Sequence, residues 1–126
     1  MENNISKIKE QLLYKRIVEW DVNKIILDDG TKVYFETTEW DCCAGGHGTF
    51  SKVKLDAMIT DVVEIENKKY FNEGADTDVN EVKIAIYHNQ NPIAQAEVYT
   101  DSGNGGYYYS VTSMIIGDVV IPVAKA

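Results

Sequence analysis

The sequence contains little arginine and no cluster of basic residues. Arg16 is the single arginine, and the 126-residue chain has 12 basic and 20 acidic side chains, a formal net charge of −8. Proteins that bind the nucleic-acid backbone place clusters of Lys and Arg against the phosphates. The scarcity of arginine and the negative charge therefore argue against direct binding to DNA or RNA.

Long hydrophobic runs are missing as well. A membrane-spanning helix needs about 20 apolar residues, whereas the run Met114–Ile116 is ended at once by Gly117 and Asp118. Residues 1–10 lack the apolar segment and the cleavage site of a signal peptide. We therefore expect a cytoplasmic protein without a membrane partner, in which both cysteines are reduced.

What the sequence does contain is a series of short segments with strand character. Residues 24–27 and 32–37 flank Asp28-Asp29-Gly30-Thr31, a turn typical of a β-hairpin. Further strands are predicted at 16–20, 62–66, 82–87, 93–99, 107–114 and 119–123, with a polar connection over 72–80. This spacing predicts a β-dominated α+β fold, an antiparallel meander sheet in a single globular domain over residues 1–126.

Two short helices are predicted beside the sheet. Asn4 or Ser6 can cap a helix through about Leu13, which carries three apolar residues on one face, Ile5, Ile8 and Leu12. Residues 54–59 are the second candidate. Their periodicity fits one helical turn or a loop that plugs the sheet.

Both cysteines lie in the nine-residue segment Trp40–Gly48, together with His47 and three of the nine glycines. Two thiolates and an imidazole can bind zinc, so Cys42, Cys43 and His47 are the candidate metal ligands, with Asp41 as a fourth. Structural zinc sites usually separate their cysteines by two to four residues, because both sulfurs must point inward. We therefore expect no metal and no other cofactor.

The same segment raises a thiol-dependent enzyme as an alternative. His47 is near enough in sequence to lower the pKa of the Cys42 or Cys43 thiol. However, no set of residues has the spacing of a known catalytic constellation. The sequence therefore favours a protein that is not an enzyme.

A second glycine-rich segment, Ser102–Gly106, joins two predicted strands. Backbone amides of such a loop can bind a phosphate group, which makes a small-molecule binder that sequesters a host signalling nucleotide another alternative. The segment lacks the following helix and the Lys of a phosphate-binding loop. A hairpin turn explains its glycines equally well.

Acidic residues and tyrosines are concentrated after residue 36. The densest acidic stretch comprises Asp61, Glu64, Glu66, Glu73, Asp76, Asp78 and Glu81, and Tyr99, Tyr107 and Tyr109 lie on predicted strands. Tyrosine is enriched at protein interfaces, although cross-strand tyrosine pairs and a solvated acidic face are ordinary features of sheets. These residues predict a surface that binds a host protein with a basic surface. The edge strand 119–123 is compatible with a homo-oligomer, within the limit set by Pro122.

Three motifs occur in order between Lys24 and Met114: the hairpin Lys24–Gly30, the segment Trp40-Asp41-Cys42-Cys43, and the turn Ser102–Tyr108. In these motifs the chain resembles a family of small, uncharacterised phage and prophage proteins with an Asp-Cys-Cys loop and an Asn-Gly-Tyr-Tyr turn. Members of that family continue after the cysteines with Glu and an aromatic-acidic stretch, where this chain has Ala44–His47. The resemblance implies a phage or mobile-element accessory protein in a bacterial host cell. Our leading hypothesis is an inhibitor of a host defence or nucleic-acid-handling factor.

Overall fold

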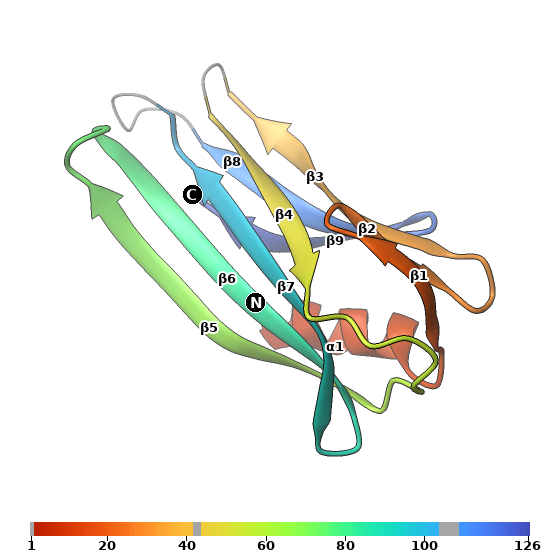
Figure 1. The fold of residues 1–126 in the computed structure, drawn as a ribbon. Coiled ribbons are helices and arrows are strands. Elements are labelled where there is room, and N and C mark those ends of the chain that lie inside the picture. The colour runs from red at the N-terminus through yellow and green to blue at the C-terminus, as the bar shows by residue number, and fades with distance from the viewer. Residues whose placement is uncertain (1, 42–43, 104–108) are drawn as a thin grey trace.

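Two antiparallel sheets face each other, and a helix lies against their edges (Figure 1). The computed structural model describes residues 2–41, 44–103 and 109–126. The five-stranded sheet has the order β1 (Ile17–Asp21), β2 (Lys24–Leu27), β3 (Lys32–Trp40), β8 (Ser110–Ile116) and β9 (Val119–Lys125). The four-stranded sheet has the order β4 (Gly45–Ser51), β7 (Asn91–Asp101), β6 (Thr77–His88) and β5 (Asp61–Asn72).

The β-dominated antiparallel fold and the N-terminal helix are confirmed, but the strands do not form one meander. Consecutive strands pair within β1-β2-β3 and within β5-β6-β7, as a meander requires. β3, however, pairs with β8, and β4 pairs with β7, so the chain crosses between two sheets. Hydrophobic alternation marks a strand without specifying its partner, and for that reason the pairing was not predictable from it.

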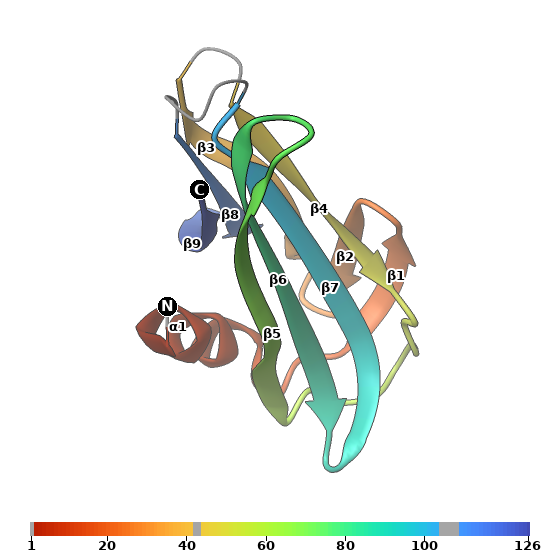
Figure 2. The same ribbon diagram turned by 90° about the vertical axis from the view of Figure 1, so that its left-hand side faces the viewer.

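α1 (Glu2–Leu12) lies against the edge strands β5 and β9, as Figure 2 shows. Ile8 and Leu12, two residues of the predicted apolar stripe, are completely buried. Burying such a side chain contributes about 1.5–3 kcal/mol relative to leaving it in water. The helix is thus held by the core that forms between the two sheets.

The predicted second helix at 54–59 is wrong. Among the described residues the segment forms a turn at Leu55 and Asp56 and then an isolated bridge between Met58 and Arg16. Its backbone hydrogen bonds go to the chain beside it, since Ile59 N–H donates to Lys15 O over 2.8 Å. These bonds require an extended conformation, and a helical turn would lose them.

The connection predicted over 72–80 is much shorter in the structure. β5 continues to Asn72 and β6 begins at Thr77, so residues 73–76 alone form the turn. Asp76 has a φ of 52°, a left-handed conformation that Asp tolerates in turns. The polar residues before and after this turn are part of the β5–β6 hairpin. Most of their side chains are exposed, so a strand there does not need apolar residues.

The glycine-rich segment after the cysteines is a strand and not a loop. Gly45, Gly46, His47 and Gly48 open β4, while Cys42 and Cys43 lie outside the described residues. A Cβ atom on Gly46 would clash with Thr112 and with the backbone of Tyr99, and one on Gly48 would clash with the Phe35 ring. These glycines therefore allow β4 to approach the opposite sheet closely.

Candidate binding face on the four-stranded sheet

The outer face of the four-stranded sheet presents rows of side chains that run across its strands. Because alternate residues of a strand share a face, the register of β4, β7, β6 and β5 defines the rows. One row contains His47, Tyr99, Glu81 and Lys68, and its neighbour contains Thr49, Glu97, Lys83 and Glu66. Together with Val82 and Val98 these residues line a shallow depression of about 310 Å³.

Tyr99 lies in the middle of this face. Its ring stacks on the imidazole of His47, with the ring centroids 5.4 Å apart and the planes inclined by 25°. Burial of the phenol, followed by the negative charge and hydrogen bonding of Asp101, raises the pKa of Tyr99 to about 12. Tyr99 therefore stays neutral at physiological pH and offers an aromatic surface with a hydroxyl group.

The two lysines of the face both contact one carboxylate. Glu66 lies 3.3 Å from the Nζ of Lys68 and 3.3 Å from that of Lys83. Hydrogen bonding from Lys83 and then from Lys68 lowers the pKa of Glu66 below its usual range. Glu97 accepts a hydrogen bond of 3.0 Å from the amide of Gln95. The face thus has one carboxylate shared by two lysines on β5 and β6, and further carboxylates, Glu81 and Glu97, on β6 and β7.

The predicted acidic residues do not share one face. Glu66 and Glu81 line the depression, whereas Glu64 is opposite the buried Ile84 and therefore faces the other side of the sheet. Three more, Glu73, Asp76 and Asp78, lie in or beside the β5–β6 turn and are exposed.

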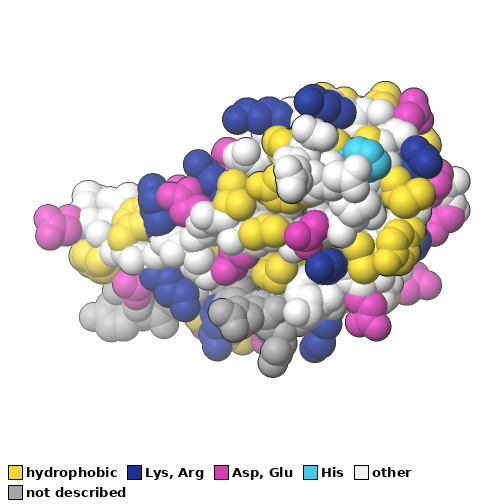
Figure 3. All heavy atoms as spheres, turned by 90° about the horizontal axis from the view of Figure 1, so that it is seen from below, with side chains coloured by type: hydrophobic (Ala, Val, Ile, Leu, Met, Phe, Trp, Pro, Cys, Tyr) yellow, Lys and Arg dark blue, Asp and Glu magenta, His cyan; other side chains and the backbone are white. Residues whose placement is uncertain are grey.

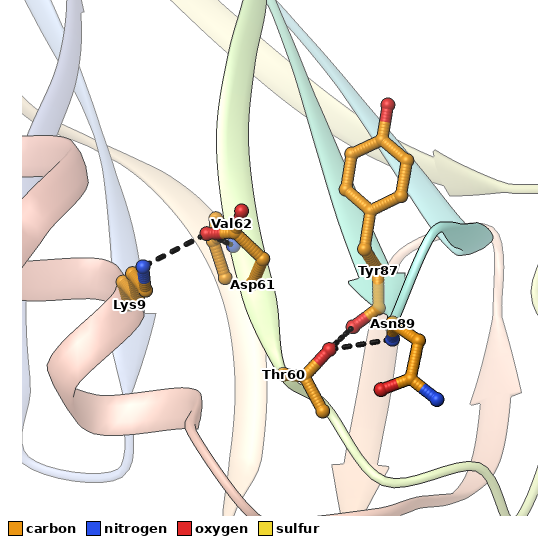
Figure 4. A network of polar contacts seen from close by, with 6 residues as sticks. All are labelled: Lys9, Thr60, Asp61, Val62, Tyr87 and Asn89. Atoms are coloured by element: carbon orange, nitrogen blue, oxygen red, sulfur yellow. Dashed lines mark hydrogen bonds and ion pairs between the residues drawn. The ribbon is translucent and has the colours of Figure 1, made fainter.

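Asp61, at the start of β5, binds α1 instead of pointing into the face. Its Oδ1 lies 3.0 Å from the Nζ of Lys9 (Figure 4). Hydrogen bonding from Lys9 and from the backbone N–H of Val62 lowers the pKa of Asp61. The adjacent Thr60 accepts a hydrogen bond of 2.6 Å from the backbone N–H of Asn89 and so ties this end of β5 to the β6–β7 turn.

The predicted tyrosines are separated as well. Tyr99 belongs to the face just described, but Tyr109 precedes β8 on the other sheet and donates a hydrogen bond of 3.2 Å to Glu39. This bond, followed by the charge of Glu39, raises the pKa of Tyr109. Tyr107 lies outside the described residues.

Of the candidate metal ligands, Asp41 and His47 lie in the described part of the chain: Asp41 is exposed just after β3, and His47 is on β4 beside Tyr99. Within residues 2–41, 44–103 and 109–126, no three His, Cys, Asp or Glu side chains come together as a metal site requires. The structure gives His47 a different neighbour, the aromatic ring of Tyr99.

Sequence reasoning missed several residues of the face, namely Lys83, Glu97 and Asp101. Lys83 alternates with buried residues of β6, and Glu97 and Asp101 share a face with Tyr99 on β7. That alternation was visible in the sequence. The sequence does not show, however, which strands pair or in which register, and this pairing brings the residues of β5, β6 and β7 together.

Figure 3 shows the molecule from below, relative to the view of Figure 1. On this side, acidic, basic and hydrophobic side chains of the described residues are interspersed. No helix in the described part of the chain has the length and apolar character needed to cross a membrane.

Comparisons with known proteins place the chain in a family. A model for a domain of unknown function, DUF7448, matches residues 10–115. The comparisons found no matching curated protein and no matching solved structure. The match covers both sheets from β1 to nearly the end of β8 and includes all of the outer face described above. The chain therefore belongs to the DUF7448 family.

Proposed function

We propose that this protein is a non-enzymatic binding protein whose outer face on the four-stranded sheet binds a basic surface of another protein. The observation that carries the proposal is the position of Tyr99 in a depression that Glu81 and Glu97 also line. Carboxylates around a neutral aromatic ring attract a Lys or Arg side chain by charge and by cation–π contact.

The charges of the face support a basic partner. Lys68 and Lys83 both contact Glu66, so the carboxylates of Glu81, Glu97 and Asp101 give the rest of the face its negative charge. The net charge of −8 for the whole chain adds a field of the same sign. Such a field raises the rate at which a basic protein is encountered and weakens with added salt.

We further propose that the partner is a host defence or nucleic-acid-handling factor and that the protein is a phage or mobile-element product acting in a bacterial cytoplasm. The motifs between Lys24 and Met114 support this origin. Proteins that handle nucleic acid carry basic channels, and rows of carboxylates on a sheet can occupy such a channel as phosphates do.

Charge reversal on the face tests the proposal. The variant Glu81→Lys/Glu97→Lys changes the face, while Glu10→Lys/Asp28→Lys makes the same change in net charge at exposed positions elsewhere. Tagged wild-type protein and both variants are used to capture proteins from a bacterial lysate, and each captured protein is purified and its affinity measured at two salt concentrations.

We expect wild type and the control variant to bind the same basic protein, with an affinity that falls as salt rises. The face variant should lose at least tenfold in affinity. Equal affinity of all three proteins would overturn the role of this face. The absence of any basic partner of wild type would overturn the proposed function itself.

A further inference from the structure

β5 is the edge strand of the four-stranded sheet, and within the described residues β6 is the strand that pairs with it (Figure 2). α1 covers the beginning of β5, where Lys9 binds Asp61. Beyond that contact, the outer edge of β5 carries backbone N–H and C=O groups that can pair with another strand.

The charges along this edge are ordered. Glu64 and Glu66 precede Asn67, and Lys68 and Lys69 follow it. Two such strands in antiparallel orientation about Asn67 bring the acidic half of each copy opposite the basic half of the other. Glu66 and Lys68 both line the outer depression and so share a face, as side chains paired directly across two strands must.

A bulge in β5 extends this match. Glu64 is opposite Ile84 and Glu66 is opposite Lys83, so Ile65 is an extra residue between them. If Ile65 is also left unpaired where β5 meets the β5 of a second copy, Glu64 comes opposite Lys69 of that copy. Glu64 faces the inner side with Ile84, and Lys69 faces the inner side with Asn80. Each copy therefore offers one acid–base match on each face of the sheet.

We propose that two copies of this chain pair through β5, antiparallel about Asn67, so that the two four-stranded sheets become one continuous sheet. Lysines and bulges normally protect an edge strand from pairing with other strands. On β5 the lysines and the bulge disfavour pairing with an unrelated strand, but they match the charges and the bulge of a second β5. The edge is therefore selective for another copy of this chain.

Apolar side chains at this edge support the same register. Val63 and Tyr70 are 37 % and 41 % exposed, and they fall opposite each other on the outer face of the paired sheets. Aromatic and β-branched side chains stabilise each other across strands. Pairing would cover both, together with the backbone groups of the edge.

This inference goes beyond the proposed function and does not depend on it. Dimerisation concerns the edge of the sheet, while binding of a basic protein concerns Tyr99, Glu81 and Glu97 on its face. In the dimer, two copies of that face would lie on the same side of one sheet.

Complementary charge variants test the pairing. In Glu64→Lys/Glu66→Lys every acid–base match becomes a pair of lysines, and in Lys68→Glu/Lys69→Glu it becomes a pair of carboxylates. Light scattering coupled to gel filtration gives the mass of wild type, of each variant alone and of an equimolar mixture. Glu19→Lys/Asp28→Lys, at exposed positions on β1 and in the β2–β3 turn of the other sheet, is the control for net charge.

We expect wild type and the control to be dimers in the micromolar range, each edge variant to be a monomer, and the mixture to be a dimer. The restored dimer would also show that both variants are folded. A monomeric wild type, or a dimer that survives in either edge variant, would overturn the proposal.

A second measurement does not depend on charge. Asn67→Cys, in a background of Cys42→Ser/Cys43→Ser, places one thiol at the two-fold axis. Mild oxidation should cross-link two copies, whereas Asn23→Cys, on an exposed turn of the other sheet, should not cross-link. Cross-linking of neither or of both would contradict the register.

Discussion

Near α1 the space between the two sheets is filled by aliphatic side chains, whereas near Gly45 and Asp101 it is filled by hydroxyl groups. The change occurs within single strands. β7 turns Ala94, Ala96 and Val98 inward before Thr100, and β8 turns Ile116 and Met114 inward before Thr112 and Ser110. Both halves are buried to a similar degree, since Ile84, Met114, Thr100 and Ser110 are all completely buried.

The hydroxyl half is held by hydrogen bonds between the sheets. Thr100 on β7 shares a hydrogen bond with Ser110 on β8, and Ser110 in turn donates to Asp101 O over 2.6 Å. The Thr100 hydroxyl also lies 3.2 Å from the carbonyl oxygen of Gly45 in its own sheet. Thr37 contacts Gly46 twice, as donor to its carbonyl over 3.0 Å and as acceptor from its N–H over 3.1 Å. Each bond is directional and accepts one spacing of the sheets.

The two halves of the interior are thus held together in two ways, one by aliphatic packing and the other by hydrogen bonds between hydroxyl and backbone groups. Aliphatic burial contributes most of the free energy of folding and tolerates small shifts, because it has no preferred direction. Buried hydroxyl groups contribute less on balance, but they are costly when left without partners. The hydroxyl half therefore fixes the position of β4, and with it the place of His47 beside Tyr99.

The largest effect is expected in the aliphatic half. Ile84→Ala removes a completely buried side chain of the core and should lower the free energy of unfolding by about 2–5 kcal/mol, through lost burial and the cavity left behind. Urea denaturation followed by circular dichroism measures it. The control Val18→Ala, at an exposed position of β1, should change stability by about 0.5 kcal/mol or less. Similar losses for both variants would contradict the assigned core.

A substitution in the hydroxyl half should come next. Gly46→Ala places a Cβ against Thr112 and the Tyr99 backbone, while Gly45→Ala meets nothing within 4 Å. We expect Gly46→Ala to lower the free energy of unfolding by about 1–3 kcal/mol, since the two sheets must separate to admit the methyl group. Gly45→Ala should stay within about 0.5 kcal/mol of wild type in the same denaturation experiment. Equal stability of the two variants would mean that β4 does not approach the opposite sheet so closely.

Gly46 also shows where prediction from the sequence stopped. Glycine in a sequence usually indicates a turn, because it lacks a side chain and adopts unusual backbone angles. At Gly46 and Gly48 the missing side chain serves close packing, and the side chains that demand it, Thr112 and Phe35, come from β8 and β3. No local pattern of residues contains that information.

Sequence patterns predicted correctly those elements that depend on neighbouring residues alone. The turn at Asp28–Thr31 was predicted and is confirmed, with Gly30 at a φ of 88°. The strands after residue 80 were located by alternation, and α1 by its apolar stripe. The candidate face required more, since Glu66, Lys83 and Glu97 meet only after β5, β6 and β7 have paired in one register.

Two threonines in the hydroxyl half sharpen the comparison. Thr100 has partners for its hydroxyl, whereas the Oγ1 of Thr112 is buried and has no hydrogen-bond partner among the described residues. Thr100→Val should therefore cost about 1–3 kcal/mol, and Thr112→Val should leave stability unchanged or raise it by about 1 kcal/mol. Thermal unfolding of both variants tests this. A loss at Thr112 as large as that at Thr100 would show that its hydroxyl is satisfied.

The smallest effect concerns acid, through exposed carboxyl groups whose pKa is lowered in the folded state. Hydrogen bonds from Thr31, aided by Lys15 at 3.0 Å, lower the pKa of Asp29 to about 2, and Lys9 lowers the pKa of Asp61. A carboxyl whose pKa is lower in the folded state stabilises the fold above its unfolded pKa of about 3.9, and this contribution is lost as the pH falls through the folded value. Stability should thus fall between about pH 4 and pH 2. Because these pairs are exposed and screened by water, Asp29→Asn should cost less than about 1 kcal/mol at pH 7 and should show a shallower acid decline in urea denaturation. Hydroxyl groups do not titrate in this range, so Thr100→Val should keep the wild-type slope. If the stability of Asp29→Asn falls with pH as steeply as that of wild type, other groups cause the acid sensitivity.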